Sequence, residues 1–382
     1  MRFILFVCQG IISYWLCSCG SRSELPTATH FILEKTDSVR IKVNDKTNIQ
    51  GVVQLISYQN QEWLCSFQYE PGFNNFHLYD LDNRVYYKTM RFASEGPDGI
   101  GKVSPVMAFI SFDSIFLYRV NSNIFYRVDS SGTLLTKIDL TKIDNGTIHV
   151  SLGFPHIINQ NELCFFRIEA ENPNSRKFLK KAKAEGIYNL RSGIYQNDRP
   201  SYPDYPHGFE ASMENWKVSR CVGPNNEFVY SFPFDNHLYV YKNGSINKFA
   251  IPNDVRPLNT TIAITIDPLN IESQMQFTAT LGMYTYLLYD SINRLYYRVY
   301  LRPGNHKDNE GNVIKVADFA WDLELIDEQF RIVGRQTFPA KIYNPYGILI
   351  SKMGILISHI NPYLPTQEDY FIYSVFRPVR SG

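Results

Sequence analysis

The chain has 382 residues, of which 44% are hydrophobic and 15% aromatic, and its 38 Lys and Arg nearly balance its 37 Asp and Glu. This composition excludes a disordered or fibrous protein. The lack of a basic excess also argues against a nucleic-acid binder, which needs a basic face to displace counterions from phosphates. The length allows two or three domains, or one long all-β domain.

The N-terminus predicts a secretory signal. It reads MRFILFVCQGIISYWLCSC, where a single Arg2 precedes an apolar run from Phe3 to Leu16. A positive start, a short apolar segment and small residues before a cleavage site are typical of such signals. The run is shorter than the roughly twenty residues that a membrane-spanning helix needs, and the alternatives are a buried helix or an uncleaved anchor.

The end of this segment, LCSC at residues 16–19, resembles the lipobox of bacterial lipoproteins. The resemblance implies that residues 1–18 are removed as a signal peptide, that Cys19 carries the lipid, and that residues 19–29 form a tether. Several acyl chains on one Cys hold a protein at a membrane much better than a single chain does. We therefore expect a lipid-anchored protein whose membrane contact is this N-terminus.

From residue 30 onward, almost every segment predicts a β-strand. Val, Ile, Tyr and Phe alternate with polar residues over short runs that end at Gly, Asn, Asp or Pro, as half-buried strands do. Asn243 and Gly244 lie between two such runs, and this pair is the strongest short hairpin signal because both residues tolerate positive φ. Further turns are predicted near residues 82, 131, 292 and 328.

Two of these turns lie in a repeated phrase, LYDLDNRVYYKTMR at 78–91 and LYDSINRLYYRVYL at 288–301. The turns near 82 and 131 are about 49 residues apart, as are those near 243 and 292. Hairpins that recur at this spacing indicate the blades of a β-propeller. The wider gap between the turns near 131 and 243 predicts one more hairpin between residues 141 and 213.

We therefore predict an all-β, six-bladed β-propeller as a single domain over residues 30–382. Its final strands have no fourth partner, and pairing them with a strand at 30–43 would close the ring and leave no long open sheet edge. A seven-bladed ring follows if the enlarged fifth blade is really two, and an open β-sandwich is the other alternative. The predicted blades cover residues 50–92, 103–140, 149–205, 214–252, 272–338, and 345–379 completed by 30–43.

One segment has helical rather than strand character. NSRKFLKKAKAEG, near 174–186, contains helix formers, a candidate cap at Ser175 and a terminal Gly186,. Five of its eight residues from Arg176 to Lys183 are Lys or Arg. We predict a basic helical insertion in the third blade, whose charged face is either solvated or in contact with lipid headgroups or an acidic partner.

Neither a metal site nor a known catalytic motif is evident in the chain. Cys65, Cys164 and Cys221 remain once the signal is removed, and apolar neighbours predict buried thiols rather than a disulfide framework,. The sequence has no GxSxG, GxxxxGK[ST] or HExxH motif, and its eight histidines are scattered,. We therefore predict no catalytic residue, no bound metal and no cofactor.

Two loops are candidate binding rims, because the connections between propeller blades surround one mouth of the channel. They are ASEGPDGIGKVSP at 93–105 and IYQNDRPSYPDYPHGFE at 194–210. A rigid loop rich in Tyr and Pro suits protein or glycan contacts, since it buries area at little entropic cost. Packing around the ring is the alternative role of both loops. The candidate side chains are Asp98, Lys102, Tyr202, Tyr205 and His207.

The phrases LYDxxNRxYYR, LIDEQFRIVGR and EGPDGIGK, after a lipobox, resemble an uncharacterised family of Bacteroidota lipoproteins. The resemblance covers nearly the whole mature chain and implies a six-bladed propeller of the TolB-like and NHL-like kind. It implies no activity, because no catalytic residues are carried over. The residues after Cys19, GSRSE, lack the acidic cluster associated with surface export in that phylum. This favours an orientation that faces the periplasm over exposure at the cell surface, and we expect the membrane to be the outer one.

The sequence thus favours a non-enzymatic protein that binds or scaffolds a partner through the channel mouth and its rim loops. An envelope protein or a glycan would suit as the partner. One alternative is a hydrolase of the lactonase-like kind, in which inward Glu, Asp and Asn residues hold a channel metal. Shifted carboxylates in the channel would favour that alternative, and an apolar channel would count against it. The other alternative is a sensor or accessory subunit of an envelope complex.

Overall fold

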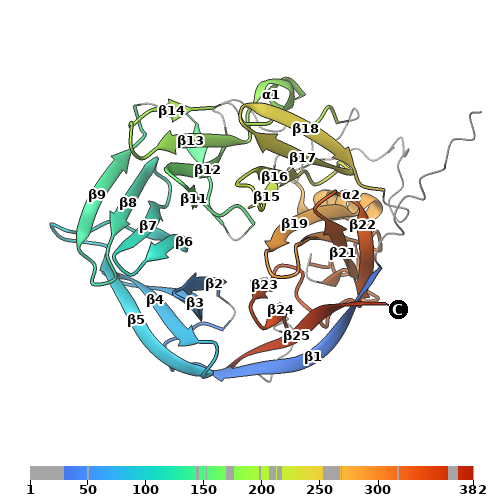
Figure 1. The fold of residues 1–382 in the computed structure, drawn as a ribbon, viewed down its shortest axis with the longest axis horizontal. Helices are drawn as coiled ribbons and strands as arrows, with labels where there is room; N and C mark the ends of the chain where they lie inside the picture. The colour runs from blue at the N-terminus through green and yellow to red at the C-terminus, as the bar shows by residue number, and fades with distance from the viewer. Residues whose placement is uncertain are drawn as a thin grey trace, which may run out of the picture.

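The strands form six sheets arranged as blades around a central axis, as Figure 1 shows. The predicted six-bladed β-propeller is therefore confirmed. In each blade the strands are antiparallel, and one short strand lies nearest the axis. The computed structural model describes residues 30–49, 51–142, 146–151, 153–168, 176–197, 199–205, 212, 217–252, 267, 269–315, 318–359 and 369–381.

The first three blades follow the chain from the axis outward. Blade 1 contains β2 (Val53–Tyr58), β3 (Gln61–Glu70), β4 (Phe73–Asp80) and β5 (Val85–Ala93). Blade 2 contains β6 (Val103–Ser111), β7 (Ser114–Arg119), β8 (Ile124–Val128) and β9 (Leu134–Asp139). Blade 3 contains β11 (Ile157–Asn159), β12 (Glu162–Ile168), β13 (Glu185–Asn189) and β14 (Tyr195–Gln196), with β10 (Thr147–Ile148) also paired to β12.

The next two blades repeat this order, and the last one does not. Blade 4 contains β15 (Ser219–Val222), β16 (Phe228–Ser231), β17 (His237–Lys242) and β18 (Ser245–Ala250). Blade 5 contains β19 (Met283–Asp290), β20 (Leu295–Leu301), β21 (Trp321–Asp327) and β22 (Ile332–Phe338). Blade 6 contains β23 (Ile348–Ser351), β24 (Gly354–Ser358), β25 (Tyr370–Arg380) and, outermost, β1 (Phe31–Lys42).

Strand β1 closes the ring, as predicted for residues 30–43. It pairs with the C-terminal strand β25 from Phe31 opposite Arg380 to Lys42 opposite Tyr370, with one bulge between Lys35 and Asp37. The two ends of the chain therefore share one sheet, and β25 has partners on both sides. An unpaired β25 would present a long row of free backbone groups.

Blade 5 settles the number of blades. The hairpins at 283–301 and 321–338 pair through β20 and β21 into one four-stranded sheet. The enlarged segment is therefore one blade, and the seven-bladed alternative is wrong. The hairpin expected between residues 141 and 213 is also present, as β13 and β14 with a turn at 190–194.

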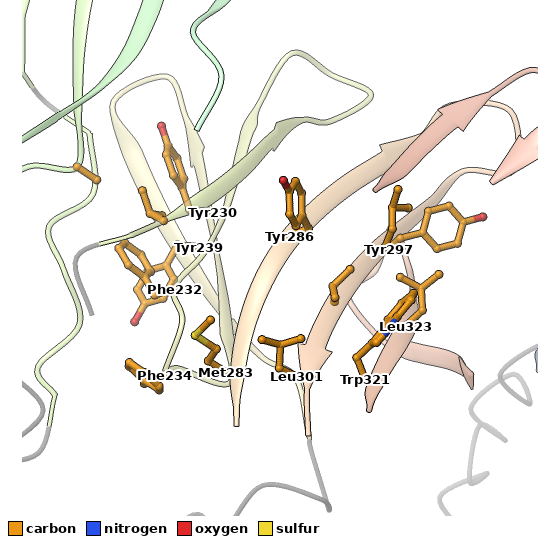
Figure 2. Close-up of a cluster of buried hydrophobic side chains, with 14 of the residues drawn as sticks. Tyr230, Phe232, Phe234, Tyr239, Met283, Tyr286, Tyr297, Leu301, Trp321 and Leu323 are labelled. Atoms are coloured by element: carbon orange, nitrogen blue, oxygen red, sulfur yellow. The ribbon is translucent and has the colours of Figure 1, made fainter. Parts of the chain in front are cut away.

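Buried aromatic side chains fill the space between neighbouring blades. Figure 2 shows this core in blades 4 and 5, where Phe232 directly follows β16, Met283 begins β19 and Trp321 begins β21. Trp321 is fully buried, its ring stacks on Phe338 with centroids 4.2 Å apart, and its Nε1 donates to the Tyr343 carbonyl at 3.2 Å. Such aromatic pairs stabilise a core by about 0.5–1.5 kcal/mol beyond their buried area.

Two helices interrupt the strands in the described part of the chain. The first, α1 (Arg176–Lys181), lies within the predicted insertion and buries Phe178 and Leu179. The second, α2 (Ile271–Leu281), was not expected, because the predicted fifth blade, residues 272–338, contained no helix. No helix among the described residues is long and apolar enough to cross a membrane.

The repeated phrase forms the same turn twice. Asp80 accepts from the Asn83 backbone N at 2.8 Å, and Asp290 accepts from the Asn293 backbone N at 3.0 Å. In both turns the following arginine has a left-handed φ of 57–58°. However, the first turn joins the outer strands β4 and β5, and the second joins the inner strands β19 and β20. The spacing between the turns near 243 and 292 therefore does not separate equivalent hairpins.

Candidate binding site

The six innermost strands enclose a cavity of about 540 Å³ along the ring axis. Every blade contributes to its wall, so the cavity is the propeller channel. The innermost strand of each blade supplies part of the wall. These parts are residues 53–57 on β2, 106–110 on β6, 155–158 at β11, 220–222 on β15, 286–289 on β19, and 346 and 348–350 at β23.

The channel wall is apolar. Most of its side chains are Val, Ile, Leu, Met, Phe or Tyr, and among the described residues no Asp or Glu lines it. Within the described part of the chain there is also no group of three or more His, Cys, Asp and Glu side chains that could hold a metal ion. A lactonase-like hydrolase would need inward carboxylates, so this donor set gives the metal-hydrolase alternative no support.

A second cavity of about 330 Å³ lies where the innermost strands begin, at one mouth of the channel. We call it the mouth pocket. Four aromatic side chains, Met283 and Pro233 make it apolar, and Lys217, Ser151, Ser219 and Thr285 add polar groups. Its size is within the range of small-molecule sites. The aromatic residues are Phe154, Tyr284, Tyr286 and Tyr346.

Two tyrosines separate the mouth pocket from the channel. Tyr286 on β19 and Tyr346 before β23 line both cavities. Their rings meet edge to face, with centroids 5.6 Å apart and an interplanar angle of 66°. Because one ring comes from blade 5 and the other precedes blade 6, this tyrosine pair spans the junction of two blades. A ligand that passes from the mouth into the channel must pass these rings.

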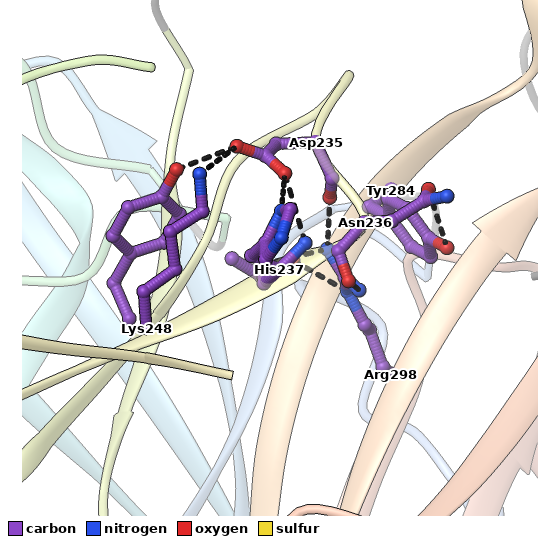
Figure 3. Close-up of polar contacts among 8 residues, drawn as sticks. Asp235, Asn236, His237, Lys248, Tyr284 and Arg298 are labelled. Carbon is purple, nitrogen blue, oxygen red and sulfur yellow. Dashed lines mark hydrogen bonds and ion pairs between the residues drawn. The ribbon is translucent and has the colours of Figure 1, made fainter. Parts of the chain in front are cut away.

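The wall at Tyr284 is held in place by a network between blades 4 and 5, shown in Figure 3. The fully buried Arg298 places its guanidinium carbon 3.3 Å from the centre of the Tyr284 ring. Arg298 also donates to Ser231 Oγ at 2.8 Å and to the Asp235 carbonyl at 2.6 Å. The Tyr284 hydroxyl donates to Asn236 Oδ1 at 3.3 Å. The position of this ring is therefore fixed before any ligand binds.

The same network orders the loop between β16 and β17. Asp235 accepts hydrogen bonds from His237 and from the Tyr239 hydroxyl, and Lys248 Nζ lies 3.8 Å from its carboxylate. Burial opposes ionisation of Asp235, but the hydrogen bonds from Tyr239 and His237 outweigh it and lower the pKa of this carboxyl,. The charged Asp235 thus fixes the loop whose Pro233 lines the mouth pocket.

A buried ion cluster lies where blades 3 and 4 meet, next to the channel wall. Glu185 on β13 accepts from Arg220 Nε and from the Tyr230 hydroxyl, and Arg199 Nε lies 3.9 Å away. Arg199 pairs with Glu162 at 2.9 Å. Arg220 donates from Nη2 to the Cys164 carbonyl at 3.2 Å, while its Nη1 has no hydrogen-bond partner. This arginine is the one charged residue among the described residues of the channel wall.

Comparison with known proteins gives the chain a family. A model described as a domain of unknown function, DUF4221, matches residues 29–330. The chain belongs to the DUF4221 family. Family membership and the propeller fold, both implied by the phrases around residues 78–102 and 288–335, are thereby confirmed. No curated protein was found to match this DUF4221 chain.

Two solved structures resemble this DUF4221 propeller. A DUF4221 member from Bacteroides vulgatus is 14% identical with a TM-score of 0.77, over 93% of this chain and 100% of its own. A candidate exported protein from Bacteroides fragilis is 10% identical with a TM-score of 0.50, over 92% and 96% of the two chains. At these identities the likeness establishes the fold and not the ligand.

Asp98 and Lys102 lie on the connection from β5 to β6, as expected, and both are exposed. Asn74 fixes the end of this loop, donating to the Gly101 carbonyl at 2.8 Å and accepting from the Val103 backbone N at 3.1 Å. Lys102 Nζ lies 5.0 Å from the centre of the Tyr69 ring. Neither rim residue lines the channel or the mouth pocket, so a ligand contact there stays a prediction.

Tyr202 and Tyr205 are not presented to a partner. Each is 6% exposed, and their rings pack against Phe232 and Phe234, with centroids 5.7 and 6.3 Å apart. The expectation of an exposed aromatic rim was wrong, because the loop lies over α1 and blade 4 and its rings fill that space. His207, the third candidate there, lies outside the described residues, as does Cys19.

The aromatic residues of the mouth pocket were not predicted from the sequence. Phe154, Tyr284 and Tyr346 look like ordinary strand and turn residues, and nothing local shows that they face the axis. The one usable signal was their place just before or at the start of each blade. A propeller brings these positions together even though they are far apart in the chain. Of the three cysteines, Cys65 and Cys164 are buried as predicted, while Cys221 is half-buried at the channel wall.

Proposed function

We propose that this DUF4221 chain is a non-enzymatic binding protein of the bacterial cell envelope that takes its ligand in the mouth pocket. The observation that carries the proposal is a pocket of about 330 Å³ with an aromatic wall, placed at the mouth of an apolar channel. Sites for small molecules are typically concave and apolar with a few polar groups. The mouth pocket has this composition.

The fixed wall supports binding rather than simple packing. Arg298 and Asn236 hold Tyr284 in one orientation, so little side-chain freedom is lost when a ligand covers the ring. Preorganised sites bind more tightly because this entropic cost is already met. The polar groups of Ser219 and Lys217 in the pocket lining would orient the ligand.

The proposed place of action is supported by the N-terminal segment. We propose that residues 1–18 direct export, that Cys19 carries the lipid, and that the propeller faces the periplasm from the outer membrane. The signal-like run and the lipobox support this proposal,. The description of the similar Bacteroides fragilis protein as a candidate exported protein agrees with it. The propeller would then present the mouth pocket to molecules within the envelope.

A dye titration with one blocking variant tests the pocket. Gly153 lines the mouth pocket, and a Cβ there would meet no atom within 4 Å, so we expect the side chain of Gly153→Leu to occupy part of the pocket without a clash at Cβ. We expect the apolar anionic dye anilinonaphthalene sulfonate to bind the wild type saturably at one site. Gly153→Leu should weaken this binding by about tenfold or more, a loss of about 1.4 kcal/mol.

The matched control is Gly304→Leu. Gly304 is exposed, lies outside the mouth pocket and meets only one ring atom, of Phe319, at 4.0 Å. It should bind the dye as the wild type does. Equal dye affinity in Gly153→Leu and Gly304→Leu would contradict the proposed site.

A further inference from the structure

The channel below the mouth pocket has a girdle of half-buried apolar side chains. We define this apolar girdle as Leu55, Ile158, Cys221, Leu288 and Leu349, one from each of five blades. Partial exposure of five apolar groups toward one cavity leaves hydrophobic surface in contact with solvent. Covering such surface with an apolar chain is favourable in proportion to the area removed from water.

One charged side chain, that of Arg220, lies at the end of the apolar girdle nearest the mouth pocket. Arg220 follows Ser219, which lines the mouth pocket, and Arg220 itself lines the channel. The Ser219 hydroxyl accepts from the Leu287 backbone N at 2.8 Å. This contact places β15 beside the part of β19 that carries Tyr286. Arg220 is thus close to the boundary that the tyrosine pair forms between the two cavities.

The hydrogen bonds of Arg220 are incomplete. Its side chain is 4% exposed, and Glu185, its carboxylate partner, also accepts from Tyr230 and lies near Arg199. Arg220 Nη1 and the nearby His156 Nδ1 have no hydrogen-bond partner among the described residues, and both residues line the channel. A buried guanidinium N–H without an acceptor is costly, and a carboxylate is the acceptor that it favours most.

We infer that the ligand of the mouth pocket and channel is an elongated apolar monoacid, of the chemical class of a fatty acid. Its carboxylate pairs with Arg220 near Tyr286 and Tyr346, and its chain lies along the apolar girdle. Arg220 Nη1 is covered by neighbouring side chains, so binding includes a small movement at this wall. The inference rests on the proposed function and adds the class of ligand.

Saturated fatty acids of increasing length, from octanoic to tetradecanoic acid, test whether the acyl chain of the ligand binds along the apolar girdle. Each is titrated below its micelle concentration by calorimetry and as a competitor of the dye. Affinity should rise about fourfold per added methylene, the ratio that corresponds to about 0.8 kcal/mol per buried CH₂. An affinity independent of length, with dye binding intact, would overturn the inference and leave the mouth pocket standing.

The head group is tested on the wild type, because changing Arg220 would leave Glu185 buried without its arginine. Dodecanoic acid is compared with dodecanol, which has the same chain. The acid should bind about tenfold more tightly, since a charge-assisted hydrogen bond contributes more than a neutral one. Equal affinities would contradict the role of Arg220 and would fit a water molecule as the partner of Nη1.

Two variants test where the acyl chain of the fatty acid lies. Leu55→Asp places a charge in the apolar girdle, and Leu135→Asp places one on the exposed outer strand β9. Leu55→Asp should lose at least about tenfold in fatty-acid affinity while still binding the dye, and Leu135→Asp should lose neither. Unchanged fatty-acid binding in Leu55→Asp would refute the channel as the site of the chain.

Discussion

The innermost strand of each blade has a free edge toward the channel. Three side chains form hydrogen bonds from the innermost part of one blade to the innermost strand of the next. Gln54 accepts from the Met107 backbone N at 3.0 Å and donates to the same residue's carbonyl at 3.3 Å. Ser219 accepts from Leu287, and His156 Nε2 lies 3.2 Å from the Ala108 backbone N. Each contact crosses from one blade to the next. These residues therefore hold neighbouring blades in register around the channel.

The buried His156 predicts a loss of stability in acid. Burial, with a smaller contribution from Arg220, lowers the pKa of His156 to about 4 in the folded chain, against about 6.5 when unfolded. The neutral ring thus stabilises the fold fully above about pH 6.5, and this contribution falls as the pH drops toward 4. When the pH falls from about 7.5 to about 5, His156 should account for about 2 kcal/mol of the decrease in the wild type's free energy of unfolding.

Urea unfolding of the wild type and His156→Gln at these two pH values measures this contribution. The variant should lose about 2 kcal/mol less than the wild type as the pH falls. His30→Gln, at the exposed start of β1, serves as the control and should follow the wild type. A variant that loses as much stability as the wild type would show that His156 is charged in the fold.

At the level of the elements, local chemistry made most of the hairpins predictable. Asn243 and Gly244 adopt the positive φ values of 50° and 79° that their turn requires,. The helix α2 was missed although Asn270 caps it, accepting from the Ser273 backbone N at 3.1 Å,. Strand-like residues on both sides concealed this signal. The mouth pocket was not predictable, because it depends on which side chains face the axis after the ring has closed.

Closure by β1 predicts that the ring cannot form stably without it. Its eleven paired positions with β25 would contribute about 10 kcal/mol at about 1 kcal/mol per hydrogen bond, and it also buries Val39 and Ile41 completely,. A chain that begins at residue 43 should therefore lose the cooperative thermal transition of the whole propeller. A chain that begins at residue 30 should keep it. Identical melting curves for both chains would refute closure by β1.

At the scale of the whole molecule, the propeller and its N-terminal segment have separate roles. The ring holds the channel and the mouth pocket, and we propose that the lipobox attaches the chain to a membrane. Labelled fatty acid should therefore be incorporated into the wild type and not into Cys19→Ala. The dye should bind both proteins equally, because Cys19 is not among the described residues that line the mouth pocket. Equal labelling of the two proteins would remove the lipid anchor from the account.

The central claim is that the ring binds an apolar acidic ligand in the channel below the mouth pocket. Native mass spectrometry of the full-length protein, purified from its own cells, tests this claim most directly. The wild type and Leu135→Asp should carry about one bound apolar acid per chain, and Leu55→Asp should carry about a tenth as much. The same mass for all three proteins, with no bound molecule on any of them, would contradict the claim.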